Sequence, residues 1–142
     1  MKKIIFCFAL FVSVLAFSNQ AKAQCDTVAT ACAKHITSQY ISDGQRYFSL
    51  LLDQEVAEFN ATFYGGTTYR LAQCSGLTDG NLVVSIFDKD RNLLFTNAEY
   101  QNAPYWDFKF KSTMDCIIEA VLNPTTNTSG SGCAVLLISF KQ

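Results

Sequence analysis

Apolar and polar side chains alternate along much of this chain. In Ala57–Phe63 and Trp106–Phe110 the apolar side chains occupy every second position. Successive side chains of a β-strand point to opposite faces, so this period of two predicts strands with one face in a core and one in water. Two further runs, Leu82–Phe87 and Cys133–Phe140, are apolar almost throughout, which is typical of strands covered on both faces. The pattern predicts an all-β domain.

Short polar segments separate these runs and supply turn residues. The predicted turns and loops are Ser42-Asp43-Gly44, Thr78-Asp79-Gly80-Asn81, Asp88–Asn92 and Asn123–Gly132. The remaining predicted strands are Gln45–Leu52, Leu93–Thr96 and Asp115–Leu122. About eight short strands at regular spacing predict an antiparallel β-sandwich of jelly-roll type.

The stretch Val56–Ser75 is predicted to form a β-hairpin around the Gly65-Gly66 pair, since two strand-like runs flank these glycines. A one-residue slip would move every side chain to the other face, so the apolar pattern fixes the register. A three-residue or bulged turn places Phe63 opposite Tyr69 and matches apolar to apolar. We therefore expect such a turn, with a glycine at positive φ.

The first 23 residues have the pattern of a secretory signal peptide. Two lysines precede an apolar run from Ile4 to Phe17, and Ala21-Lys22-Ala23 forms an A-x-A cleavage site. The apolar run is shorter than the roughly 18–20 residues that a membrane-spanning helix needs. We expect cleavage between Ala23 and Gln24, export to the periplasm or beyond, and no stable membrane insertion of the mature chain.

The mature chain should begin with a short helical segment. Alanines at alternate positions favour a helix over Asp26–Thr37, with Asp26 or Thr27 as its cap. We therefore divide the mature chain into a helical segment, residues 24–41, and a β-sandwich domain, residues 42–142.

Charge restricts the partners of the mature chain. Removal of the leader takes away three lysines and no acid, so the net charge changes from −1 to −4. An acidic protein without a basic cluster is a poor ligand for nucleic acid or anionic lipid. Neither is predicted as a partner.

Five cysteines remain after cleavage: Cys25, Cys32, Cys74, Cys116 and Cys133. Export permits disulfides, and the odd count leaves at least one thiol free or bonded to another chain. Seven residues of helix separate the first two sulfurs by roughly 10 Å, and the last two are expected at opposite ends of neighbouring strands, so neither pair should bond. The remaining choices link the N-terminal segment to the sheet, or Cys74 to a strand.

No metal or cofactor site is predicted, because the chain has a single histidine and no C-x-x-C spacing. Asp88, Asp90 and Asn92 have the spacing of a calcium loop, but Leu93 occupies the position that requires glycine, so a solvated hairpin turn is expected there.

No enzyme is predicted, because no catalytic motif accompanies the only histidine, His35. We expect His35 to be an exposed helix residue. A catalytic role would require a carboxylate to meet it in a cleft.

Three aromatic residues close in the sequence, Tyr100, Tyr105 and Trp106, are the candidate ligand-binding residues. Aromatic faces stack on sugar rings, so together they could form a glycan platform. The alternative is that Trp106 lies in the core, since it belongs to the inward-facing positions of its strand.

The runs TFYGGTTYRLAQCSG, LVVSIFDKDRNLLF, PYWDFKFKST and GCAVLLISF resemble the bacterial pre-peptidase C-terminal-like domain, and more closely short exported proteins of the Bacteroidota type. The resemblance extends from about Ser42 to Phe140. It implies a jelly-roll-like sandwich of the kind usually appended to secreted peptidases and implicated in secretion or substrate binding. This chain differs in carrying a helix in place of a catalytic domain.

These observations predict an exported, non-catalytic binding module. The first hypothesis is that it recognises an envelope component or glycan through loops or aromatic residues. The alternative is a protein-interaction module that acts as an accessory subunit or inhibitor of a secreted enzyme, held through a sheet edge or the unpaired cysteine.

Overall fold

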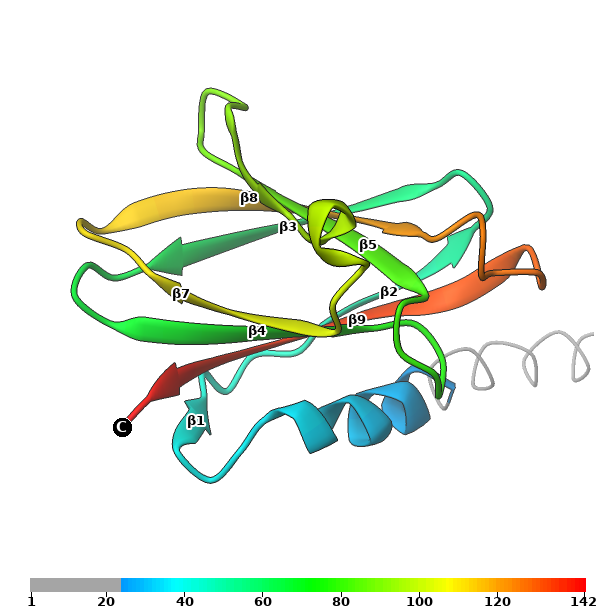
Figure 1. Cartoon of the computed structure of the whole chain (residues 1–142), viewed down its shortest axis with the longest axis horizontal. Helices are drawn as coiled ribbons and strands as arrows, with labels where there is room; N and C mark the ends of the chain where they lie inside the picture. The colour runs from blue at the N-terminus through cyan, green and yellow to red at the C-terminus, as the bar shows by residue number, and fades with distance from the viewer. Residues whose placement is uncertain (1–23) are drawn as a thin grey trace, which may run out of the picture.

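Nine strands form two facing antiparallel sheets in the computed structural model, which describes residues 24–142 (Figure 1). The strands are β1 Tyr40–Ser42, β2 Tyr47–Leu52, β3 Val56–Phe63, β4 Thr68–Cys74, β5 Leu82–Phe87, β6 Leu93–Thr96, β7 Tyr105–Lys109, β8 Met114–Leu122 and β9 Ser131–Lys141. Sheet A has the order β1-β9-β4-β7, with β2 also paired to β9, and sheet B has the order β3-β8-β5-β6. The predicted all-β sandwich is confirmed. The predicted signal peptide lies outside the described residues.

The core fills the space between the two sheets. Its fully buried side chains come from both layers: Phe63, Ile86 and Ile118 from sheet B, and Leu71 and Leu136 from sheet A. Removing each such side chain from water contributes about 1.5–3 kcal/mol. The alternation seen in the sequence identifies these inward positions because every strand of the sandwich buries one face.

The predicted hairpin over Val56–Ser75 is wrong. Its two runs are strands, but β3 pairs with β8 in sheet B and β4 pairs with β7 and β9 in sheet A. Phe63 and Tyr69 do meet, with ring centroids 5.0 Å apart, but they meet across the core and not along one sheet. Period-two alternation marks the buried face of a strand and leaves the neighbouring strand undetermined.

The two glycines let the chain cross between the sheets. Gly66 has φ +82°, as expected, and its N–H donates to the carbonyl of Phe110 at 2.9 Å. A Cβ on Gly65 would lie 2.8 Å from the Cα of Ser112, so only glycine permits this approach of the β3–β4 and β7–β8 connections.

The expected pairing of the last two strands is also wrong. β8 belongs to sheet B and β9 to sheet A, so the loop between them crosses the sandwich and is no hairpin. By contrast, β5 and β6 do form the predicted hairpin. Its turn is held locally, because the Asp88 carboxylate accepts hydrogen bonds from the backbone N–H groups of Asp90 and Asn92. The Asp88 carboxylate is therefore engaged in hydrogen bonds within this turn.

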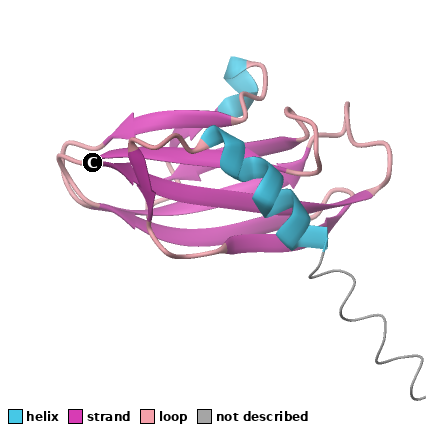
Figure 2. Cartoon of the chain, turned by 90° about the horizontal axis from the view of Figure 1, so that it is seen from below, coloured by secondary structure: helices cyan, strands magenta, loops and turns pink. Residues whose placement is uncertain are grey.

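A helix at the start of the described chain crosses the outer face of sheet A (Figures 1 and 2). It covers residues 24–32 and continues as the 3₁₀ turn η1, Ala33–His35, so it ends two residues before the predicted Thr37. Ile36 is already extended, and β1 follows within the segment that was expected to be helical. No helix in residues 24–142 has the length and apolar character needed to span a membrane.

Two disulfides fix this helix to sheet A. Cys25 bonds to Cys133 on β9, and Cys32 bonds to Cys74 on β4. Cys116 on β8 is the free cysteine of the described chain, and it is buried. The structure thus joins the N-terminal segment to the sheet and leaves one buried thiol. Disulfides are typical of proteins in oxidising compartments, which agrees with export of this chain.

Candidate functional site

The most organised polar cluster lies on the outer face of sheet A, beside the end of the N-terminal helix. Arg70 on β4 and Asp107 on β7 are directly opposite each other in the strand register. The guanidinium donates two hydrogen bonds to this carboxylate, from Nε at 2.7 Å and from Nη2 at 2.8 Å. Its third nitrogen donates to the carbonyl of His35 at 3.0 Å. Arg70 therefore joins both strands to the helix.

Two tyrosines enclose the Arg70 guanidinium. The rings of Tyr40 and Tyr105 each have their centroid 4.4 Å from its central carbon, a distance that permits cation–π attraction. The Tyr40 hydroxyl also donates to Asp107 at 2.9 Å. These contacts leave the Arg70 side chain only 12% exposed. We refer to Tyr40, Arg70, Tyr105 and Asp107 as the Arg70 cluster.

The electrostatics of the Arg70 cluster favour its charged state. The hydrogen bonds from Arg70 lower the pKa of Asp107, and the same hydrogen bonds raise the pKa of Arg70. Both groups are therefore ionised over the whole physiological pH range. A cluster whose charges are mutually satisfied is suited to holding side chains in place.

His35 lies next to this cluster and is not the exposed residue that was predicted. Its side chain is 11% exposed, its ring lies 5.5 Å from that of Tyr105, and Nε2 is 3.0 Å from the Asp79 carboxylate. Lys34 contacts the same carboxylate oxygen at 3.1 Å. Burial alone would raise the pKa of Asp79, but the hydrogen bonds from His35 and Lys34 lower it.

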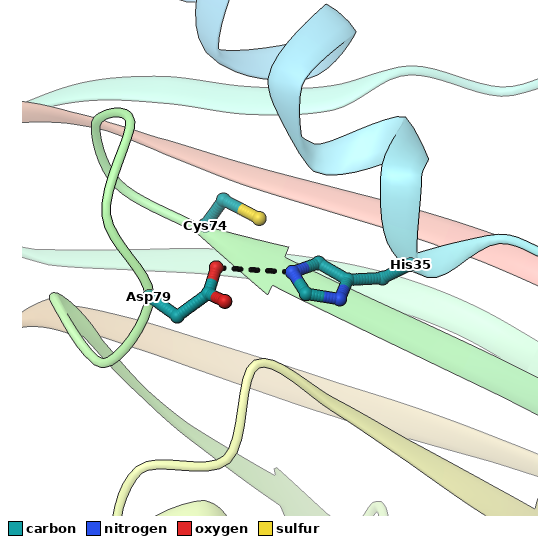
Figure 3. Close-up of side chains that lie close together, drawn as sticks. All are labelled: His35, Cys74 and Asp79. Atoms are coloured by element: carbon teal, nitrogen blue, oxygen red, sulfur yellow. Dashed lines mark hydrogen bonds and ion pairs between the residues drawn. The ribbon is translucent and has the colours of Figure 1, made fainter.

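Figure 3 shows His35, Asp79 and Cys74 converging from the end of the helix, the β4–β5 loop and β4. Their ligand atoms lie within 4.8 Å of one another, which is close enough to suggest a metal site. The Cys74 sulfur, however, is bonded to Cys32 and has no thiolate to offer. In the described chain this group therefore presents a metal ion with only two ligands.

The same geometry bears on catalysis. His35 and Asp79 have the arrangement of a base and its orienting carboxylate, so the convergence that an enzyme would require does occur. Within residues 24–142, however, no hydroxyl or thiol hydrogen-bonds to the His35 ring. Asp79 itself lies exposed at the surface. In this part of the chain the His35–Asp79 pair therefore has no side-chain nucleophile beside it.

The three aromatic candidates do not form one platform. Tyr105 and Trp106 are consecutive on β7 and point to opposite faces of sheet A. Trp106 packs with Tyr100, ring centroids 4.3 Å apart, and with Phe95 at 5.3 Å, on the side that faces sheet B. Tyr105, which is 40% exposed, belongs to the Arg70 cluster. The structure brings Tyr100 and Trp106 together and separates Tyr105 from them.

A cleft of about 800 Å³ opens at one side of the sandwich, and the strand residues that line it come mainly from β3, β8 and β9. Tyr47, Tyr69 and Cys116 contribute to its walls, and an ion pair between Lys89 and Asp115 lies at its rim. Burial, with the nearby carboxylates, raises the pKa of Cys116 to about 11. The thiol is therefore protonated at neutral pH, and it is a poor nucleophile.

Sequence reasoning missed Arg70, Asp107 and Tyr40. One signal was available: Arg70 and Asp107 are oppositely charged residues at outward positions of their strands. Their pairing depends on β4 lying beside β7, and these strands are more than 30 residues apart in the chain.

Neither protein-family models nor curated protein sequences match this chain, so its resemblance to the pre-peptidase C-terminal-like domain stays a prediction. Among solved structures, the chain is similar to PliG of Aeromonas hydrophila, a periplasmic lysozyme inhibitor of g-type lysozyme. The TM-score is 0.53 at 10% sequence identity, and the match covers 71% of this chain and 91% of that one. At this identity the likeness concerns the fold.

Proposed function

We propose that this protein is an exported protein-interaction module that binds and inhibits a secreted enzyme. The observation that carries the proposal is the fold likeness to PliG, which extends over nearly the whole of that inhibitor. The matched fold accounts for 91% of that inhibitor, so a sandwich of this kind can make up most of a small enzyme inhibitor. Fold alone does not set function, so the proposal also rests on the site.

The Arg70 cluster supplies a suitable contact surface. Tyrosine and arginine are enriched among the residues that dominate protein–protein binding energy, especially where the side chains are already fixed before binding. Arg70 holds the rings of Tyr40 and Tyr105 in place, and both disulfides anchor the adjacent helix. We propose that Tyr105, with Lys34 and His35 beside it, contacts the enzyme.

The glycan hypothesis has less support. Its three aromatic residues do not share a face, and the two that meet are packed on each other and on Phe95. A protein partner is favoured over a sugar on this ground.

The test is an inhibition assay with the mature chain purified after export. A g-type lysozyme and two secreted hydrolases of unrelated fold are titrated with it, and residual hydrolysis of their substrates is followed. We expect stoichiometric inhibition of at least one enzyme. Tyr105→Ala should weaken it tenfold or more, whereas Tyr64→Ala, which removes another exposed tyrosine at the β3–β4 connection, should not. If both variants inhibit as strongly as the unmodified chain, the contact with the enzyme does not lie at the Arg70 cluster.

A further inference from the structure

Strand β2 is an edge strand without the usual protection. Within residues 24–142 it pairs only with β9, and Tyr47–Leu52 contains no charge, proline or glycine. The other edges are protected, because β3 carries Glu58, β7 carries Asp107 and Lys109, and β1 has only three residues. The β6 edge is four residues long and adjoins a bulge. Exposed edges left unprotected are sites of strand pairing between chains.

The backbone groups that face away from β9 can be identified. The N–H of Asp53 donates to Gly130, which continues the register in which Leu51 is opposite Gly132. In an antiparallel ladder, hydrogen bonding to a given neighbour alternates along the strand. The N–H and C=O groups of Phe48 and Leu50 therefore point outward, while the outward N–H of Leu52 is already bonded to the Glu55 carboxylate.

Apolar side chains accompany this open backbone. Phe48, Leu50 and Leu52 all project from the outer face of sheet A and are 39%, 46% and 57% exposed. Three large apolar side chains in a row on an edge strand are costly to leave in water and are typical of an interaction surface. A strand added beside β2 would cover these side chains and would form hydrogen bonds with the outward N–H and C=O groups of Phe48 and Leu50.

The charges at the two ends of β2 select the occupant. Arg46 precedes the strand and Asp53 follows it, and both are exposed. A second copy running antiparallel, with Phe48 opposite its Leu50, places Arg46 of each chain opposite Leu52 of the other and one position from Asp53, so opposite charges come close at both ends of the edge. Arg46 also contacts Asp26 of its own chain at 3.4 Å, a weak exposed pair that a second copy can replace. We propose that two copies of this protein associate through β2, with Phe48 opposite Leu50 of the second copy and the twofold axis at Ser49.

This register uses the outward-facing backbone groups of β2, including the Leu50 carbonyl, to which the Ser49 hydroxyl donates a long hydrogen bond of 3.5 Å. Phe48 and Leu50 exchange backbone hydrogen bonds in each direction, and their side chains pair on the outer face. The contact joins two copies of sheet A into one sheet across the dimer. One strand pair buries much less than the roughly 1,200–2,000 Å² of a stable interface, so we expect association in the micromolar range.

The first test is sedimentation velocity of the mature chain from about 1 μM to about 1 mM, a span that brackets such an affinity. A concentration-dependent monomer–dimer equilibrium is expected. Leu50→Lys should weaken dimerisation at least tenfold, whereas Leu77→Lys, an equivalent change at an exposed loop leucine, should leave it unchanged. Arg46→Asp should weaken it a few fold, and the double variant Arg46→Asp with Asp53→Arg should restore it.

The second test fixes the register. Opposed residues at a non-hydrogen-bonded position have Cα atoms about 4.5 Å apart, within the range for a disulfide. Ser49→Cys should therefore form a covalent dimer under mild oxidation, while Ser112→Cys, on an exposed loop, should not. A chain that stays monomeric at the highest concentration, with no Ser49→Cys cross-link, overturns the proposal. Equal effects of Leu50→Lys and Leu77→Lys overturn it too. If Leu50→Lys instead abolishes enzyme inhibition by a monomeric chain, the edge serves the enzyme and not a second copy.

Discussion

Replacing Arg70 tests whether the Arg70 cluster is a rigid unit of the fold. Arg70→Met keeps much of the apolar stem but removes the two hydrogen bonds to Asp107, the one to His35 and the attraction to both tyrosine rings. Hydrogen bonds to charged groups contribute about 1.5–3 kcal/mol and cation–π contacts about 0.5–1 kcal/mol. These contributions are not additive, and Asp107 is 39% exposed, so water replaces part of the loss. We expect a cost of about 2–4 kcal/mol.

The assay is urea unfolding of the oxidised mature chain, followed by the fluorescence of its single tryptophan, Trp106, next to Asp107. With a slope of about 1–3 kcal/mol per molar urea, the midpoint should fall by about 1–2 M or more. Arg46→Met is the control, since Arg46 is 77% exposed and makes one ion pair with Asp26 at 3.4 Å. Its effect should stay below about 0.5 kcal/mol.

The pH dependence gives a second readout of the same variant. Because the folded-state pKa of Asp107 is lowered by Arg70, its contribution is complete above the ordinary Asp pKa of about 3.9 and is lost as the pH falls through the folded value. Arg70→Met should therefore lose less stability than the unmodified chain when acidified below about pH 4. The idea that the Arg70 cluster is a rigid unit of the fold is contradicted by either of two results. One is that Arg70→Met and Arg46→Met lower the free energy of unfolding equally, and the other is that Arg70→Met leaves the acid dependence of stability unchanged.

Three further perturbations address the core and the cysteines. Phe63→Ala should cost about 3–5 kcal/mol in the same urea assay, because this fully buried ring packs on Tyr69 and on a second phenylalanine; a cost below about 1 kcal/mol would contradict its place in the core. Replacing both Cys25 and Cys133 with serine should cost about 2–5 kcal/mol, since their disulfide closes a segment of 108 residues. The thiol of Cys116 should react with Ellman's reagent at pH 8 only after denaturation, because it is buried and its pKa is raised to about 11; rapid reaction of the folded protein would contradict this.

Local features of the fold were predictable from the sequence. The β5–β6 hairpin was predicted because its turn is made by neighbouring residues, with the Asp88 carboxylate binding N–H groups two and four residues later. The bounds of both strands followed from the apolar run and this turn. The buried face of β3 was also predicted, since alternation depends on the strand alone.

Neighbour relations were not predictable in the same way. The rings of Phe63 and Tyr69 could pack together equally well as neighbours in a hairpin or as residues of two facing sheets. Only the packing of the whole chain decides between these arrangements. The same reasoning explains why Arg70 was missed, because its partner Asp107 becomes adjacent only through the pairing of β4 with β7.

The cysteines lie between these two cases. Helical spacing excluded a bond between Cys25 and Cys32, but the choice of Cys133 and Cys74 as their partners depends on β9 and β4 lying under the helix. The odd count required an unpaired cysteine, and the structure assigns it to Cys116.

We propose that this chain binds a protein and not the envelope glycan. The most direct measurement compares two immobilised partners under identical conditions: a g-type lysozyme, as a representative secreted enzyme, and purified peptidoglycan. We expect saturable binding of the mature chain to the enzyme surface, weakened tenfold or more by Tyr105→Ala, and no retention by peptidoglycan. Retention by peptidoglycan that depends on Tyr100 and Trp106, with no enzyme bound, would contradict the account.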